Sequence, residues 1–303
     1  MSEARVIAAV TASAFERLSS LAPPNIAVLR LPDGLERAAF VVPSSERGQV
    51  LDALPQQHAV EVVQTLSAGT DWIEPAVPPW ATLCNARGAR DVPMAEWVVG
   101  ALLGAVTGQL DAAARRRWSE KRPGELHGMT VLVLGHGSIG RAVECRLAPF
   151  GVHVVGVASR ARDGVHGVDE LDALLPSADA VVVLLPLTRS TRGLIDASVL
   201  ARMRDGALFV SAGRGAVVDT DALVAELASG RLRAVLDVTD PEPLPHGHPL
   251  WELALAITPH NAGDSDAADE RAIDLAAQQL ARYARGEPLA NVVRHASDTL
   301  RRA

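Results

Sequence analysis

The feature that most constrains the fold is the stretch VLVLGHGSIG, which ends at Gly140. Its apolar run predicts a buried strand, and its three glycines have the spacing GxGxxG ahead of a helical segment, RAVECRLAPFG. Gly135 is expected to make the tight turn, Gly137 to let a pyrophosphate approach the backbone, and Gly140 to let the helix pack closely. A helix beginning near Ser138 would point its first amides at the phosphate charge. The motif predicts a dinucleotide site, with a purely structural glycine turn as the alternative.

Short β-rich runs alternate with helical patterns along the whole chain, as in α/β proteins. The runs, from RVIAAV to ALAITPH, are continuous and apolar, which favours parallel strands buried on both faces. Two long helices are expected, over 93–118 and 266–285. This order predicts a Rossmann dinucleotide-binding domain over 95–268. It is inserted into a smaller α/β domain, 1–94, to which the C-terminal helix and the rest of 269–303 return.

Composition excludes several classes of function. The chain has 303 residues and a net charge of −7, without a basic block, which argues against a nucleic-acid partner. Cys84 and Cys145 are the only cysteines, so we expect a reducing compartment, the cytoplasm, and no disulfide framework. His246 and His248 lack further ligands in their loop, so no metal is expected. The longest apolar stretch, WVVGALLGAV, is too short to span a bilayer, and the N-terminus does not resemble a signal peptide.

Arg214 comes after an apolar strand, in the stretch SAGRGAVVD. The carboxyl ends of strands in open α/β sheets are where ligands bind. Flanking glycines would let the turn aim the guanidinium inward, where it can grip a carboxylate with two hydrogen bonds. The alternative is an exposed arginine in a tight turn.

Glu242 and His260 come after the next two predicted strands, in LDVTDPEPLP and ITPHNAG. A carboxylate beside an imidazole stabilises its protonated form and fixes its tautomer, which makes a proton-transfer pair. Taken singly, His260 could be a buried histidine satisfied by the backbone, and Glu242 a surface acid. Arg214, Glu242 and His260 each come after a consecutive strand of one domain, and this joint pattern favours an active site.

Seven motifs in order resemble the D-isomer-specific 2-hydroxyacid dehydrogenases, a family that includes glyoxylate/hydroxypyruvate reductases and phosphoglycerate dehydrogenases. They are QTLSAGTDWI, PMAEWVVGALL, ELHGMTVLVLGHGSIG, VVVLLPLTRSTRGLI, LFVSAGRGAVVDTDAL, LDVTDPEPLPHGHPLW and ITPHNAG, between Gln64 and Gly263. The resemblance implies hydride transfer between a nicotinamide and a small 2-keto or D-2-hydroxy acid. His260 would be the acid/base, Glu242 would hold it protonated, and Arg214 would bind the carboxylate and polarise the carbonyl.

The resemblance also implies that 1–94 and 269–303 form a discontinuous, flavodoxin-like substrate domain, and it assigns binding residues. The amides of Ala68 and Gly69 would give a second carboxylate contact, and the long helix from Pro93 implies a homodimer. Residues expected at the cofactor are Gly135, Gly137, Ser138, Ile139, Gly140, Ser159, Arg160, Arg162, Pro186, Thr191, Ala212, Asp237 and Gly263. Candidates for the substrate pocket are Leu66, Trp72, Met94 and Trp251. The chain departs from the family at Ser211, where Asn is usual.

The stretch ASRAR, from Ala158 to Arg162, bears on the choice of dinucleotide. The end of the second Rossmann strand usually carries an acid that binds the ribose hydroxyls of NAD and repels the 2′-phosphate of NADP. Ala158 removes that repulsion, while Ser159, Arg160 and Arg162 offer hydrogen bonds and positive charge. We expect NADP to be preferred, with NAD possible. The alternative is a solvated loop and NAD held by weak ribose contacts.

Two other functions stay open at this point. A phosphite-type dehydrogenase on the same fold would keep Arg214, Glu242 and His260, whereas formate enzymes of the family have Gln where Glu242 stands. A dinucleotide-sensing corepressor would use the fold without catalysis, because fold alone does not prove function. The sequence does not identify which keto acid is the substrate.

Overall fold

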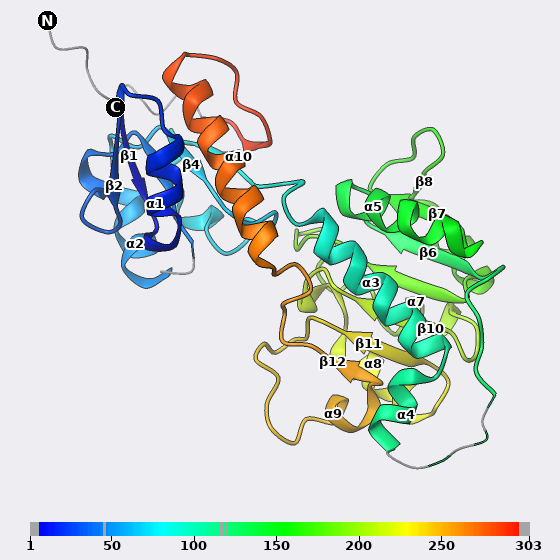
Figure 1. Cartoon of the computed structure of the whole chain (residues 1–303). Coiled ribbons are helices and arrows are strands. Elements are labelled where there is room, and N and C mark those ends of the chain that lie inside the picture. The colour runs from blue at the N-terminus through cyan, green and yellow to red at the C-terminus, as the bar shows by residue number, and fades with distance from the viewer. Residues whose placement is uncertain (1–5, 45–46, 116–117, 119, 121, 297–303) are drawn as a thin grey trace, which may run out of the picture. The chain divides into compact units, whose positions relative to one another are not determined.

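The computed structural model describes residues 6–44, 47–115, 118, 120 and 122–296, and forms two compact units (Figure 1). One unit takes the chain up to Arg90 and from Ser265 onward, and the other is Asp91–Asp264. Both divisions fall four residues before the expected boundaries. The reason is that each division coincides with a helix start: α3 (Asp91–Val106) begins at the first, and Ser265 caps α10 (Asp266–Ala284) at the second.

The first unit is built on a six-stranded sheet in the order β13-β5-β4-β3-β1-β2. Its strands are β1 (Val6–Val10), β2 (Ile26–Arg30), β3 (Phe40–Val42), β4 (Val62–Gln64), β5 (Thr82–Cys84) and β13 (Val292–Arg294). The first five pair in parallel in the order 2-1-3-4-5, which is the flavodoxin-like order. The short strand β13 adds antiparallel to β5 and was not anticipated from the sequence.

Helix α10 packs against α1 (Ala12–Leu21) and brings the C-terminal segment back to the first unit (Figure 1). Arg17 on α1 donates two hydrogen bonds to the Asp274 carboxylate on α10, at 2.8 and 2.9 Å. These bonds lower the pKa of Asp274 below its ordinary value. Helix α2 (Arg47–Ala53) completes the α-helices of this unit in the described residues.

The second unit carries a fully parallel sheet in the order β12-β11-β10-β9-β6-β7-β8. Its strands are β6 (Thr130–Leu134), β7 (His153–Ala158), β8 (His166–Gly167), β9 (Ala180–Val183), β10 (Leu208–Ser211), β11 (Arg233–Leu236) and β12 (Ala256–Ile257). Numbered within the unit the order is 3-2-1-4-5-6-7, which extends the Rossmann order by one strand. Every residue of β9 and β10 is buried, as expected for central parallel strands.

The single helix expected over 93–118 is wrong. Helix α3 ends at Val106, and α4 (Gln109–Arg115) begins three residues later at an angle of 69° to it. Gly108 takes the left-handed backbone, with φ at 74°, and the Thr107 hydroxyl donates to the Leu103 carbonyl at 2.6 Å. Both features end a helix whose apolar pattern continues across the break.

The other helices of the second unit come after its strands. They are α5 (Ser138–Leu147), α6 (Leu171–Leu174), α7 (Ala197–Arg202), α8 (Thr220–Ala228) and α9 (Leu250–Leu253). Within the described ranges, no one helix has the length and apolar character needed to cross a membrane, although the bent pair α3–α4 meets both criteria when counted together.

Candidate active site

The glycine loop joins β6 to α5, and its shape requires glycine at two positions. Gly135 has φ at 99°, and a Cβ there would lie 2.8 Å from the Leu184 carbonyl oxygen. A Cβ on Gly140 would lie 2.8 Å from the Gly135 oxygen. Gly137 is different, because it is exposed and no atom lies within 4 Å of an added Cβ. The open space over Gly137, ahead of the first turn of α5, fits the pyrophosphate of a dinucleotide.

Hydrogen bonds fix this loop on the sheet. The amides of Gly135 and His136 both donate to the Val157 carbonyl, at 2.9 and 3.0 Å. Beside the loop, the Ser138 hydroxyl donates to Asp91 at the start of α3, at 3.1 Å. The Ile139 side chain is partly buried against the core beneath the loop. The contact that we expect it to make with a cofactor is therefore left to its backbone amide and to the exposed part of its side chain.

The end of β7 and the segment just beyond it contain the four residues expected to set the choice of dinucleotide. Ala158 is half-buried, whereas Ser159 and Arg160 are exposed. Arg160 has no hydrogen bond or ion pair to any residue in the described part of the chain. Arg162 is exposed too, but its guanidinium donates to the backbone carbonyl of His136 in the glycine loop.

Arg214 lies in a turn that two glycines make possible. It precedes a short 3₁₀ turn, Gly215–Val217, and its guanidinium donates to the Gly213 carbonyl at 3.0 Å. A Cβ on Gly213 would lie 2.5 Å from the Leu185 oxygen, and one on Gly215 only 1.9 Å from the Thr239 oxygen. The loops on both sides therefore pack directly on the backbone that carries Arg214.

Glu242 and His260 come together although 18 residues separate them. His260 Nδ1 lies 2.6 Å from Glu242 Oε1, and the two side chains are 39% and 42% exposed. The backbone of His260 has φ at 55°, in the left-handed region that costs energy for a residue with a Cβ. With Nδ1 bonded to the carboxylate, Nε2 is left as the nitrogen that can exchange a proton with a ligand.

Asp237 explains how the loop of His260 holds that conformation. The residue is 2% exposed, and its carboxylate accepts hydrogen bonds from three donors in the segment after β12. The Thr258 hydroxyl donates at 2.6 Å, and the Asn261 and Ala262 amides donate at 3.0 and 3.1 Å. The His260 amide donates to the Asp237 carbonyl at 2.8 Å. Sequence reasoning assigned Asp237 to the nicotinamide and missed this positioning of His260, which no local pattern signals.

The remaining cofactor candidates lie at the same edge of the sheet. Pro186 and Ala212 come after β9 and β10, and Gly263 comes after β12. The Thr191 hydroxyl donates to the Pro186 carbonyl at 2.6 Å and thereby closes the loop between them. Because all strands of this sheet are parallel, the carboxyl edge collects the glycine loop, Arg214, Glu242 and His260.

The substrate candidates divide between the two units. Ala68, Gly69, Leu66 and Trp72 belong to the first unit, where Asn85 donates to the Ala68 carbonyl at 2.7 Å. Met94 and Trp251 belong to the second, where the Trp251 indole donates to the Pro245 carbonyl at 3.0 Å.

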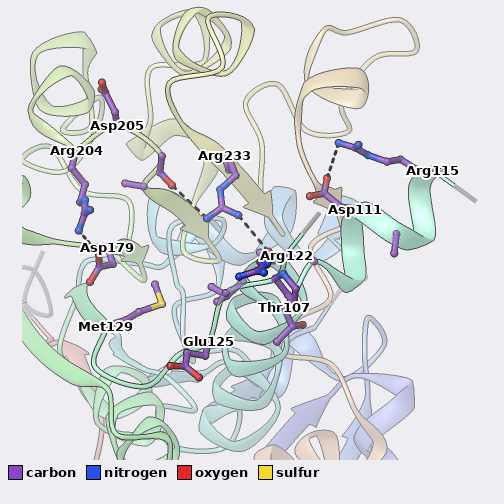
Figure 2. A pocket seen from close by; sticks show the side chains of 18 residues that line it. Thr107, Asp111, Arg115, Arg122, Glu125, Met129, Asp179, Arg204, Asp205 and Arg233 are labelled. Atoms are coloured by element: carbon purple, nitrogen blue, oxygen red, sulfur yellow. Dashed lines mark hydrogen bonds and ion pairs between the residues drawn. The ribbon is translucent and has the colours of Figure 1, made fainter. Parts of the chain in front are cut away.

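A pocket of about 500 Å³ lies at the opposite, amino-terminal edge of the second unit's sheet (Figure 2). Met129, Asp179 and Ala207, which line it, directly precede β6, β9 and β10, and Arg233 begins β11. Figure 2 shows Arg204 turned toward Asp179, with which it forms an ion pair. The size of this pocket does not make it the active site, since the glycine loop and the His260–Glu242 pair lie at the other edge.

Comparison with known proteins agrees with this geometry. A family model described as D-isomer specific 2-hydroxyacid dehydrogenase, NAD binding domain, matches residues 101–262. Glyoxylate reductase from Thermofilum pendens is 34% identical over 259 residues, covering 79% of this chain and 75% of that one. D-3-phosphoglycerate dehydrogenase from Methanocaldococcus jannaschii is 33% identical over 257 residues, covering 80% of this chain but only 49% of that one.

A solved structure extends the likeness to nearly the whole chain. It is that of an NADPH-dependent glyoxylate/hydroxypyruvate reductase from Sinorhizobium meliloti in complex with NADP and sulfate. The TM-score is 0.82 at 28% identity, with 95% of this chain and 98% of that chain covered. The chain belongs to the D-isomer specific 2-hydroxyacid dehydrogenases, and it is an NAD(P)-dependent oxidoreductase with a Rossmann cofactor domain.

Proposed function

We propose that this chain is an NADP-preferring reductase of a small 2-keto acid, of the glyoxylate or hydroxypyruvate type, that forms the D-2-hydroxy acid. The observation that carries the proposal is the 2.6 Å contact between His260 and Glu242 at the carboxyl edge of the dinucleotide sheet. An imidazole held in this way by a carboxylate is a proton donor, which a keto oxygen needs as hydride reaches its carbon.

Each catalytic side chain has one task in this scheme. The nicotinamide, when bound, supplies the hydride in reduction and accepts it in oxidation. His260 donates the proton from Nε2 to the keto oxygen, and Glu242 stabilises the imidazolium through Nδ1. Arg214 binds the substrate carboxylate with its planar fork and draws electron density from the neighbouring carbonyl. The amides of Ala68 and Gly69 add a second contact to that carboxylate.

The preference for NADP rests on the residues at the end of β7 and just beyond it. Ala158 presents no carboxylate to repel a 2′-phosphate, and Arg160 has no competing partner among the residues that the structure describes. Ser159 adds a hydroxyl donor beside it. The solved relative from Sinorhizobium meliloti, which is NADPH-dependent and contains NADP, supports the same choice.

The substrate class rests on relatives of known activity. Glyoxylate reductase and glyoxylate/hydroxypyruvate reductase both resemble the chain over most of its length. Phosphoglycerate dehydrogenase is matched over only half of its own length.

We further propose that the chain forms a homodimer and that it works in the cytoplasm. Free Cys84 and Cys145 suit a reducing compartment, and burial raises the pKa of the Cys84 thiol to about 11, which keeps it protonated.

The test is a steady-state comparison of NADPH and NADH oxidation with glyoxylate, hydroxypyruvate and 3-phosphohydroxypyruvate. We expect turnover with the first two and a kcat/KM at least about tenfold higher with NADPH, since a hydrogen bond to a charged group contributes roughly 1.5–3 kcal/mol. Arg160→Ala should remove this preference, and Ala158→Asp with Arg160→Ala should reverse it. Failure to reduce any 2-keto acid, or reduction of NADP⁺ by phosphite, would overturn the proposed function. Equal use of both cofactors would overturn the preference alone.

A further inference from the structure

Arg162 was expected to act beside Arg160 on a 2′-phosphate, but its guanidinium is engaged elsewhere. It donates to the backbone carbonyl of His136, the residue between the first two glycines of GHGSIG. Its own backbone is held as well, because Arg162 and Val165 exchange two hydrogen bonds of 2.9 and 2.8 Å across a turn. Val165 is buried, so the base from which the arginine reaches the glycine loop is fixed to the core.

His136 is also held by two further polar contacts and by close packing of its ring. Its amide donates to the Val157 carbonyl at 3.0 Å, and its Nε2 lies 2.8 Å from Glu144 on α5. Its ring packs over Gly156 so closely that a Cβ on that glycine would lie 2.6 Å from the ring. The other polar group of the His136 backbone is its carbonyl, which accepts the hydrogen bond from the Arg162 guanidinium.

This carbonyl belongs to the peptide group that joins His136 to Gly137. On its amide side, Gly137 donates to the Gly135 carbonyl at 2.8 Å. Arg162 fixes the carbonyl side, so the plane of this peptide is set at both ends. The next amides along the chain, at Ser138 and Ile139, begin α5, where the pyrophosphate is expected.

We infer that Arg162 is a positioning residue for the pyrophosphate loop and not a ligand of the 2′-phosphate. The inference rests on the proposed use of GHGSIG to bind the dinucleotide. The pyrophosphate is common to NADH and NADPH, so Arg162 acts on both cofactors alike, whereas Arg160 acts on NADPH alone. Arg162 thus contributes to the affinity for both cofactors, and Arg160, two residues earlier in the same loop, contributes to the selection of NADPH over NADH.

The test measures dissociation constants of NADPH and NADH by fluorescence titration, with no substrate present. Arg162→Ala should raise both constants by the same factor, about tenfold, because it removes one charge-assisted hydrogen bond. Arg160→Ala is the matched control and should raise only that of NADPH. Arg162→Lys should recover part of the loss for both cofactors. Gly156→Ala, which pushes the His136 ring from the other side, should also weaken both.

Hydrogen exchange in the cofactor-free protein gives a second readout. Amides over 135–140 should exchange faster in Arg162→Ala than in the wild type and keep their wild-type rates in Arg160→Ala. Loss of NADPH binding alone in Arg162→Ala, or unchanged binding of both cofactors, would overturn the inference. Failure of the proposed NADP preference shows separately, as equal binding of the two cofactors by the wild type.

Discussion

Replacing Gly215 by alanine should disable the enzyme without touching a side chain that contacts substrate. A Cβ at this position would lie 1.9 Å from the carbonyl oxygen and 2.2 Å from the carbonyl carbon of Thr239. Real Cβ atoms do not approach heavy atoms within 3.0 Å, so the loops after β10 and β11 must separate by about 1.1 Å. The obstacle is backbone, which no change of rotamer can relieve.

Separating these two loops should disturb catalysis because both carry side chains to which we assign catalytic roles. Arg214 precedes Gly215, and Glu242 lies three residues after Thr239, so the separation moves Arg214, the proposed carboxylate ligand, away from Glu242, the partner of His260. A misplacement of about 1 Å can cost about 10²-fold in rate. We expect a loss of that order in kcat/KM, with a loss of roughly 1–3 kcal/mol in stability from overpacking.

The assay is steady-state reduction of the best keto acid, run well below the midpoint of thermal unfolding of the variant. Gly48→Ala in α2 is the matched control, because nothing lies within 4 Å of its added Cβ. It should keep full activity and gain about 0.5–1 kcal/mol in stability. A folded Gly215→Ala enzyme with kcat/KM within about twofold of wild type would show that contact between these loops does not set the catalytic geometry.

Three further variants probe separate parts of the site and the fold. Arg214→Lys keeps the charge but loses the planar fork, so KM for the keto acid should rise and kcat should fall; wild-type constants would assign Arg214 to the turn alone. Glu242→Gln removes the carboxylate from His260, so the pH optimum of keto-acid reduction should move lower, and an unchanged profile would count against the pair. Asp196 caps α7 by accepting from the Val199 amide at 2.9 Å, which lowers its pKa below the ordinary 3.8. The cap therefore stabilises the fold above that pH and is lost as the pH falls through the lowered pKa, so Asp196→Ala should lower Tm at pH 7, and its difference from wild type should shrink as the pH falls below 3.8.

The sheets were predictable because their strands are buried on both faces and read as continuous apolar runs. The run DAVVVLLP predicts β9, and the glycine spacing after β6 predicts the start of α5. β8 was missed because His166–Gly167 contains no apolar run, and β13 because the two valines of Val292–Arg294 stand alone between polar residues. The break between α3 and α4 was missed because the apolar pattern continues past Gly108, and one glycine does not reveal its backbone angle.

Only one aspect of the candidate site was predictable from the sequence, namely which loops meet at the carboxyl edge of the sheet. Parallel strands bring the loops at their carboxyl ends to one edge, which is why Glu242 and His260 could be expected near one another. The sequence could not show that the Asp237 carboxylate accepts hydrogen bonds from three donors of the next loop. Nor could it show that Arg162 turns back to His136. Both depend on how loops from different strands meet, which spacing along the chain does not encode.

The most direct test of His260 as the proton donor is the kcat of His260→Ala for keto-acid reduction at saturating NADPH, with the dissociation constant of NADPH measured beside it. If His260 supplies the proton, kcat should fall about 10²–10⁴-fold, which is the usual contribution of general acid–base catalysis. The affinity for NADPH should stay within about twofold of wild type, because the imidazole acts on the substrate and not on the cofactor. A fall in kcat of less than about tenfold would contradict the assignment of His260 as the proton donor.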